Sequence, residues 1–129
     1  MNYVNCDKVS VMKGKLGYSV FARVNIKKDD IIETALMIPL VGANGEDNPH
    51  LHTWSEDRKT WACSSGVVAY YNHSDTPNAK KYGNLNNNTL VVKALSDIKA
   101  GVEIRTQYMS KPWRKCFSMM SENFLLPFK

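Results

Sequence analysis

The feature that most constrains this chain is a succession of short apolar runs, each closed by a cluster of Gly, Asn, Asp, Ser or Pro. The runs are rich in β-branched and aromatic residues and show no helical stripe. Turn residues of this kind end strands because they fix φ or bond to their own backbone. The pattern predicts an all-β or β-rich domain of many short strands. The expected strands are residues 8–13, 17–24 and 31–41 (as one strand or two), the two arms of a hairpin over 79–95, and 101–108.

Three further segments are less clear. Residues 42–50 contain two glycines and a proline and are expected to form a loop. Within 51–71, Trp54 and Trp61 lie seven positions apart, which permits a short helix, although two serines and a glycine interrupt it. The apolar tail, 116–129, is compatible with a helix that ends before Pro127.

One internal similarity joins two distant segments. Residues 25–32 (NIKKDDII) and 97–104 (DIKAGVEI) both read as a strand, a tight turn and a strand. Hairpin chemistry can produce such a match by coincidence, and two copies alone do not establish a repeat architecture.

Composition sets outer limits on the function. With 129 residues, 43% of them hydrophobic and 22% charged, the chain suits one globular domain with a single core. The net charge of +5 weakly favours an acidic or polyanionic partner. Cys6, Cys63 and Cys116 are too scattered for a disulfide framework or a structural zinc site, so we expect free thiols. The sequence shows no signal peptide or membrane span, and we expect a cytoplasmic or host-intracellular protein.

The most informative stretch is AYYNHSDTPNAKKY, residues 69–82. Local rules explain it only as a turn and give no reason for a histidine between asparagine and serine. Together with 17–22 (GYSVFA), 97–104 and Tyr108, in this order, the segment NHSDTPNA (72–79) resembles the SET domain, the β-rich fold of protein lysine methyltransferases. The run from Thr53 to Ala79 is most similar to compact bacterial and viral SET proteins.

The resemblance covers the chain from about Val9 to Trp113. It implies a mainly β fold of short strands and small sheets with a knot-like C-terminal crossing. Residues 1–129 would form one SET-like domain with its core at 9–113. The C-terminal segment, 114–129, would pack on the core, cap the site or form a dimer contact.

The resemblance also implies that S-adenosylmethionine is the cofactor. Gly17 matches a glycine whose lack of a Cβ lets the backbone approach the cofactor closely. Asn72 and His73 match the residues that hold the cofactor, largely through backbone groups. Ser19 departs from the glycine usual in the family, and weaker cofactor affinity is the expected consequence. The full set of expected cofactor-binding residues is Lys15, Gly17, Tyr18, Ser19, Asn72, His73, Tyr108 and Trp113.

Tyr108 matches the catalytic tyrosine of the family. Methyl transfer from a sulfonium is an in-line displacement, so alignment and the exclusion of water are its main requirements. A phenol hydroxyl can orient the methyl group, and desolvation beside a cation lowers the pKa of the incoming lysine. The chemistry needs no metal, and we expect none. Trp54, Tyr70 and Tyr71 are candidate substrate-binding residues, although core or strand packing is the simpler interpretation of each.

Three functions remain open from the sequence. The leading hypothesis is a protein-lysine N-methyltransferase acting on a histone or another lysine-bearing protein. The second is a catalytically inactive SET-fold interaction module, which the serine at position 19 motivates. The third is a basic nucleic-acid-binding domain, which scattered lysines without interleaved aromatics do not favour. A homodimer is a possible assembly, and we expect neither membrane association nor specific nucleic-acid binding.

Overall fold

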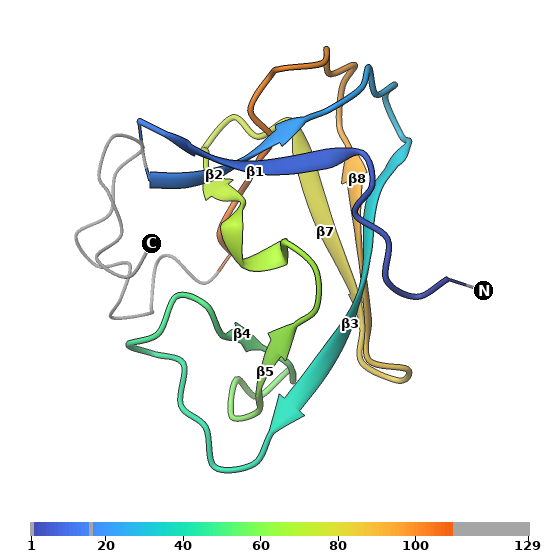
Figure 1. Ribbon diagram of the computed structural model, residues 1–129. Coiled ribbons are helices and arrows are strands. Elements are labelled where there is room, and N and C mark those ends of the chain that lie inside the picture. The colour runs from blue at the N-terminus through green and yellow to red at the C-terminus, as the bar shows by residue number, and fades with distance from the viewer. Residues whose placement is uncertain (1, 16, 110–129) are drawn as a thin grey trace.

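The computed structural model describes residues 2–15 and 17–109, and this part of the chain is mainly β (Figure 1). The one helical element among the described residues is a single 3₁₀ turn, η1 (Val68–Tyr70). The strands are β1 (Val9–Gly14), β2 (Gly17–Ala22), β3 (Ile31–Leu40), β4 (His52–Thr53), β5 (Trp61–Ser64), β6 (Asn72–His73), β7 (Ala79–Asn84), β8 (Thr89–Ala94) and β9 (Arg105–Thr106).

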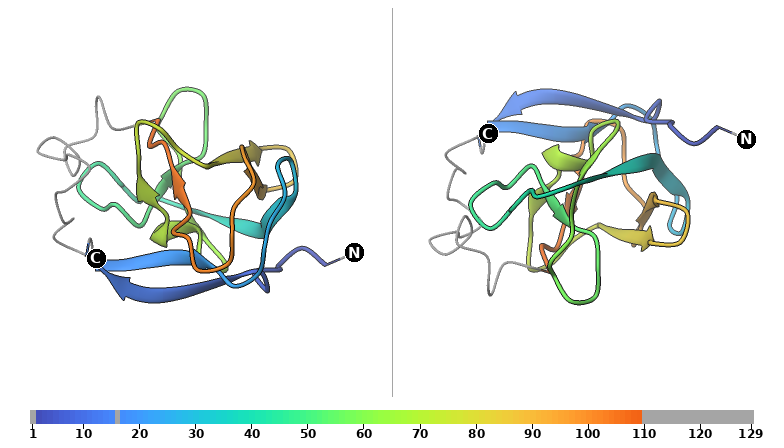
Figure 2. Two further views of the ribbon diagram at one scale, coloured as in Figure 1. Left: turned by 90° about the horizontal axis from the view of Figure 1, so that it is seen from above. Right: turned by 90° about the horizontal axis from the view of Figure 1, so that it is seen from below.

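The strands form three small sheets. The largest has the order β4-β5-β3-β8-β7, with antiparallel pairing throughout. The β1–β2 hairpin is a separate antiparallel sheet that runs along one side of the molecule (Figure 2). The third sheet pairs β6 with β9 in parallel, so a segment near the end of the described chain is bound to the middle of the sequence. The parallel pair therefore joins two segments that are distant in the sequence.

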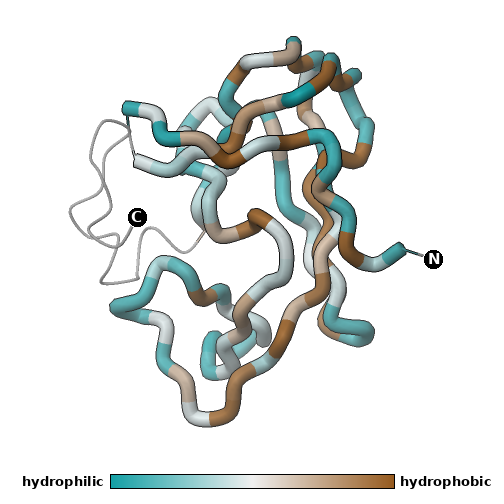
Figure 3. The backbone as a smooth tube through the Cα atoms, in the orientation of Figure 1, coloured by the Kyte–Doolittle hydropathy of each residue, from teal (hydrophilic) through white to brown (hydrophobic). Residues whose placement is uncertain are grey.

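Alternation along the central strands builds the core. In β8, Leu90, Val92 and Ala94 are buried while the residues between them are not. This period of two places one face of the sheet against the core. Apolar residues also recur along β3 (Figure 3), where Ala35 and Met37 point inward.

The two similar segments noticed in the sequence lie against each other as a symmetric pair. Ile26 and Ile98 exchange two backbone hydrogen bonds of 2.8 Å each. Asn25 Oδ1 accepts from the backbone N–H of Ala100 at 3.0 Å, and Asp97 Oδ1 accepts from that of Lys28 at 2.8 Å. Each bond in one segment thus has a counterpart 72 positions away, so the similarity is structural.

The correspondence extends to residues 20–34 and 92–106, which we call the N-terminal repeat and the C-terminal repeat. Asp29 N–H donates to Ala94 O at 2.9 Å, and its counterpart Gly101 N–H donates to Ala22 O at 2.8 Å. Both turn residues have positive φ, 72° at Asp29 and 89° at Gly101. The two strand–turn–strand units therefore pair with each other through matching hydrogen bonds, in an approximately twofold-symmetric arrangement.

Several sequence expectations need correction. Residues 51–71 form no α-helix, because β4, β5 and η1 occupy the region. The long run 31–41 forms one strand, which is one of the two arrangements expected. The expected strand over 101–108 is reduced to β9 and one isolated bridge between Phe21 and Glu103. The expected tail helix lies outside the described residues. Within residues 2–15 and 17–109, no helix has the length and apolar character needed to cross a membrane.

Candidate functional site

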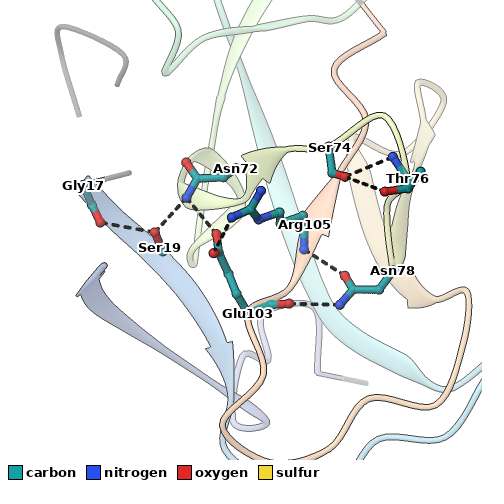
Figure 4. Close-up of polar contacts among 8 residues, drawn as sticks. All are labelled: Gly17, Ser19, Asn72, Ser74, Thr76, Asn78, Glu103 and Arg105. Atoms are coloured by element: carbon teal, nitrogen blue, oxygen red, sulfur yellow. Dashed lines mark hydrogen bonds and ion pairs between the residues drawn. The ribbon is translucent and has the colours of Figure 1, made fainter. Parts of the chain in front are cut away.

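The candidate site forms where β6 meets β9. Asn72 pairs with Arg105 and His73 with Thr106, and the next residue, Ser74, donates its backbone N–H to Thr106 O at 2.9 Å. This parallel ladder brings the Asn-His motif beside the strand that leads to Tyr108. The Asn-His motif and the strand that leads to Tyr108 thus meet at one place, and Ser19 on β2 joins them there through its contact with Asn72 (Figure 4).

Asn72 is held by two acceptors. Its side-chain nitrogen Nδ2 donates to Ser19 Oγ at 2.7 Å and to Glu103 Oε2 at 2.9 Å (Figure 4). Ser19 also donates its own hydroxyl proton to the carbonyl of Gly17 at 3.2 Å. Asn72 is 5% exposed and Ser19 1% exposed, so water competes little for these bonds.

A second part of the network holds Glu103 and Arg105. The Glu103 carboxylate pairs with the Arg105 guanidinium at 3.1 Å. The Asn78 side chain donates to Glu103 O at 2.9 Å and accepts from Arg105 N–H at 2.8 Å, which clamps the backbone on either side of residue 104 (Figure 4). The sequence indicates no role for these three residues, although all lie in or next to the segments that carry the resemblance.

Tyr108 is fixed through three contacts. Its hydroxyl donates to the carbonyl oxygen of Tyr71, and its backbone N–H donates to His73 Nδ1 at 2.9 Å. Its ring meets the His73 ring edge to face, with 5.3 Å between centroids. Since Nδ1 accepts, Nε2 carries the proton of the neutral imidazole and donates to Asp75 Oδ1 at 2.7 Å. His73 therefore positions Tyr108 through its side chain, a role that the sequence had not suggested.

Tyr71 and Glu33 form a buried pair behind Tyr108. The Tyr71 side chain is fully buried, and its hydroxyl donates to Glu33 Oε1 at 2.8 Å. Burial raises the pKa of Glu33, against the opposing effect of hydrogen bonds from Val67 N–H and Tyr71 and of the charge on Lys81. Burial and the neighbouring Glu33 carboxylate raise the pKa of Tyr71. The Tyr71 ring thus belongs to the core and is not available to a substrate, whereas its carbonyl reaches the site.

An aromatic group lies near the start of β2. The Tyr18 ring meets the Tyr70 ring edge to face at 6.5 Å, and His50 meets Tyr70 at 6.0 Å. Tyr18 is 49% exposed, whereas Tyr70 is partly buried against the core. Lys15 is exposed in the β1–β2 turn, and no contact with the network is seen for it. Trp113 lies outside the described residues.

A cavity of about 550 Å³ adjoins Tyr108. Trp54 lines it, together with Lys81 from β7 and Met109. The Lys81 ammonium lies over two rings, 5.7 Å from the Tyr108 centroid and 5.8 Å from that of Tyr71. Of the three predicted substrate-binding residues, only Trp54 lines this cavity, and its indole N–H donates to Asn88 at 2.8 Å.

The residues present fit a sulfonium cofactor with an amino-acid portion. Gly17 has a φ of 90°, a backbone conformation that favours glycine, so this position has no side chain to block the approach of a cofactor. The oriented amide of Asn72 and the exposed ring of Tyr18 can supply polar and aromatic contacts. Among the described residues, no group of His, Cys, Asp and Glu side chains is arranged to hold a metal ion.

Comparison with known proteins agrees with this geometry. The SET domain family matches residues 17–109. A search among curated protein sequences returned no match. The fold is similar to that of a candidate histone methyltransferase from Plasmodium falciparum, with a TM-score of 0.65, 29% identity, and coverage of 78% of this chain and 92% of that one.

Two fungal structures are more distant. The Neurospora histone lysine methyltransferase DIM-5 gives a TM-score of 0.60 and 18% identity, over 78% of this chain and 52% of that one. Chaetomium thermophilum polycomb repressive complex 2 bound to S-adenosylmethionine gives 0.66 and 20%, over 82% of this chain and only 16% of that one. These two show the fold alone. Since the family match spans well over half of the sequence and the strand arrangement agrees with it, the chain belongs to the SET domain family.

Proposed function

We propose that this protein is an S-adenosylmethionine-dependent protein-lysine N-methyltransferase. The observation that carries the proposal is Tyr108, whose phenol and backbone are both fixed beside the Asn72–His73 ladder. Tyr108 also lines the cavity of about 550 Å³, where a substrate could reach it. The histone methyltransferases among the similar structures suggest a histone as the first substrate to test.

The cofactor, when bound, supplies a methyl group on a cationic sulfonium. Gly17 and Asn72 would hold its amino-acid portion, since one hydroxyl, that of Ser19, bonds to both. Tyr18 and Tyr70, which contact each other edge to face, would contact the cofactor from one side.

Tyr108 would align the transfer. Its oxygen and the carbonyl of Tyr71 form a pair of fixed dipoles that can attract the polarised methyl group and orient the attacking amine. The amine must be neutral to attack, whereas a free lysine has a pKa of about 10.4. Desolvation and the nearby positive sulfonium favour the neutral form, and the proton leaves to solvent before transfer.

The test compares wild type with Tyr108→Phe. Radiolabelled methyl transfer to a mixture of core histones measures activity, and titration calorimetry measures cofactor affinity. We expect the phenylalanine variant to transfer methyl groups about 10²-fold more slowly, the loss typical of one removed transition-state contact. Tyr82→Phe, which alters an exposed tyrosine on β7, is the matched control and should behave as wild type. A wild-type protein that neither binds the cofactor nor transfers label, or a fully active Tyr108→Phe, would refute the proposal.

The alternative of an inactive module rested on the serine at position 19. In the structure this side chain points to Asn72 and bonds with it, and nothing in that contact indicates a closed site. No observation therefore favours the inactive module over the enzyme.

A further inference from the structure

Ser19 occupies a position where the family usually has glycine, and it lies at the centre of the network around Asn72 (Figure 4). We propose that Ser19 is a positioning residue, which fixes the side-chain amide of Asn72 for the cofactor. The inference rests on the proposed function. It reverses the expectation from sequence that serine here weakens cofactor affinity.

The first step concerns the direction of the amide. A serine hydroxyl has one proton and two lone pairs. The proton goes to the carbonyl of Gly17, so the oxygen faces Asn72 as an acceptor. Glu103 is the second acceptor, and both take their hydrogen from Nδ2. The amide is therefore held with its nitrogen toward β2 and Glu103, and its carbonyl oxygen lies on the opposite side.

The second step concerns the cost of losing the hydroxyl. Ser19 is 1% exposed, so water cannot readily replace its oxygen. With glycine or alanine at this position, Asn72 Nδ2 would lose its 2.7 Å hydrogen bond to Ser19 and keep the bond to Glu103. The loss would weaken the restraint on rotation about the Cβ–Cγ bond. Cofactor binding would then have to order the amide and offset that entropy.

The third step concerns Gly17. The same hydroxyl bonds to Asn72 at 2.7 Å and to the Gly17 carbonyl at 3.2 Å. It therefore links β6 to the start of β2, the two segments predicted to hold the amino-acid portion of the cofactor. A glycine at position 19 has no atom that could make either bond, so Ser19 sets the relative position of both.

The first experiment titrates S-adenosylmethionine into wild type, Ser19→Ala and Ser19→Gly by calorimetry. One buried hydrogen bond corresponds to about a tenfold change in affinity, and we expect both variants to bind about tenfold more weakly. Ser10→Ala, which changes a serine on β1 outside the network, should keep the wild-type affinity. Thermal unfolding without cofactor shows whether each variant is folded.

The second experiment asks whether Ser19 acts through Asn72. In the Asn72→Ala background, Ser19→Ala should change affinity by less than about twofold, because coupled residues are not additive. The side-chain amide signals of Asn72 in ¹⁵N NMR spectra give a readout without cofactor. We expect faster hydrogen exchange and broader signals in Ser19→Ala than in wild type.

The outcomes separate the two proposals. If wild type binds the cofactor and Ser19→Gly binds it equally well or more tightly, the role of Ser19 is overturned and the proposed function stands. An Asn72 amide equally protected in Ser19→Ala would overturn the positioning role by itself. A wild-type protein that does not bind the cofactor would overturn the proposed function, and the role of Ser19 toward the cofactor with it.

Discussion

The N-terminal and C-terminal repeats have the same backbone arrangement and different roles. Their buried apolar positions carry identical residues: Val20 and Val92, Ala22 and Ala94, Ile26 and Ile98, Ile32 and Ile104. Their turns exchange matching hydrogen bonds. The N-terminal repeat continues into the central strand of the main sheet, whereas the C-terminal repeat continues into β9 and Tyr108.

The repeats diverge where one of them reaches the site. Position 31 is a half-exposed isoleucine, and its counterpart at 103 is the glutamate that binds Asn72. Position 33 is a buried glutamate, and its counterpart at 105 is the arginine that pairs with Glu103. One sequence thus provides an internal comparison: positions that the fold requires are shared, and positions that the site requires differ.

The largest effect should come from the shared isoleucines. Ile26→Ala and Ile98→Ala each remove a buried side chain, and we expect each to lower the free energy of unfolding by about 2–5 kcal/mol. Because the two residues pair directly, the double variant should not show the sum of the two costs. Urea denaturation measures all three. A large cost at one position and none at the other would show that the repeats are not equivalent in the core.

An exchange of residues between the repeats should have the next largest effect. Glu103→Ile leaves the amide of Asn72 and the Arg105 guanidinium without their carboxylate, at a cost of about 1–3 kcal/mol in stability. We also expect weaker cofactor binding by calorimetry. The reciprocal change, Ile31→Glu, places a charge at a position 45% exposed and should alter neither quantity measurably. Equal effects of the two exchanges would remove the functional distinction between the repeats.

The sequence carried enough information for the fold and for part of the site. The strand runs and the hairpin over 79–95 follow from the residue pattern, and the resemblance to SET domains implies the grouping of Asn72, His73 and Tyr108. The contacts of Ser19 and Glu103 with Asn72 did not, because they join residues more than 30 positions apart in the sequence. The burial of Tyr71 was likewise hidden, since two adjacent tyrosines give no sign of which one faces the core.

The buried carboxyl group of Glu33, whose counterpart in the C-terminal repeat is Arg105, predicts that stability depends on pH. Burial raises the pKa of Glu33 above its ordinary value of 4.5, so the native state binds the proton more tightly than the unfolded chain. The stabilisation is complete below that value and is lost as the pH rises through the window up to the raised pKa. In urea titrations from about pH 4 to pH 7, the stability of wild type should therefore fall relative to Glu33→Gln. A difference between the two proteins that stays constant with pH would contradict this.

The smallest effect concerns the two turns. Gly101 and Asp29 share a left-handed backbone, and a Cβ added at Gly101 would meet nothing within 4 Å, so Gly101→Ala isolates the conformational cost. We expect this change to lower the free energy of unfolding by about 1 kcal/mol. Gly101→Asp should cost less, because aspartate tolerates this conformation better than alanine and already occupies it at position 29. Asp29→Gly should be neutral or slightly stabilising, since relief of strain offsets the greater entropy of the unfolded glycine. Thermal unfolding of the three variants gives the ranking. If Gly101→Asp destabilised as much as Gly101→Ala, the two turns would share a backbone shape without sharing the local interactions that allow aspartate at position 29.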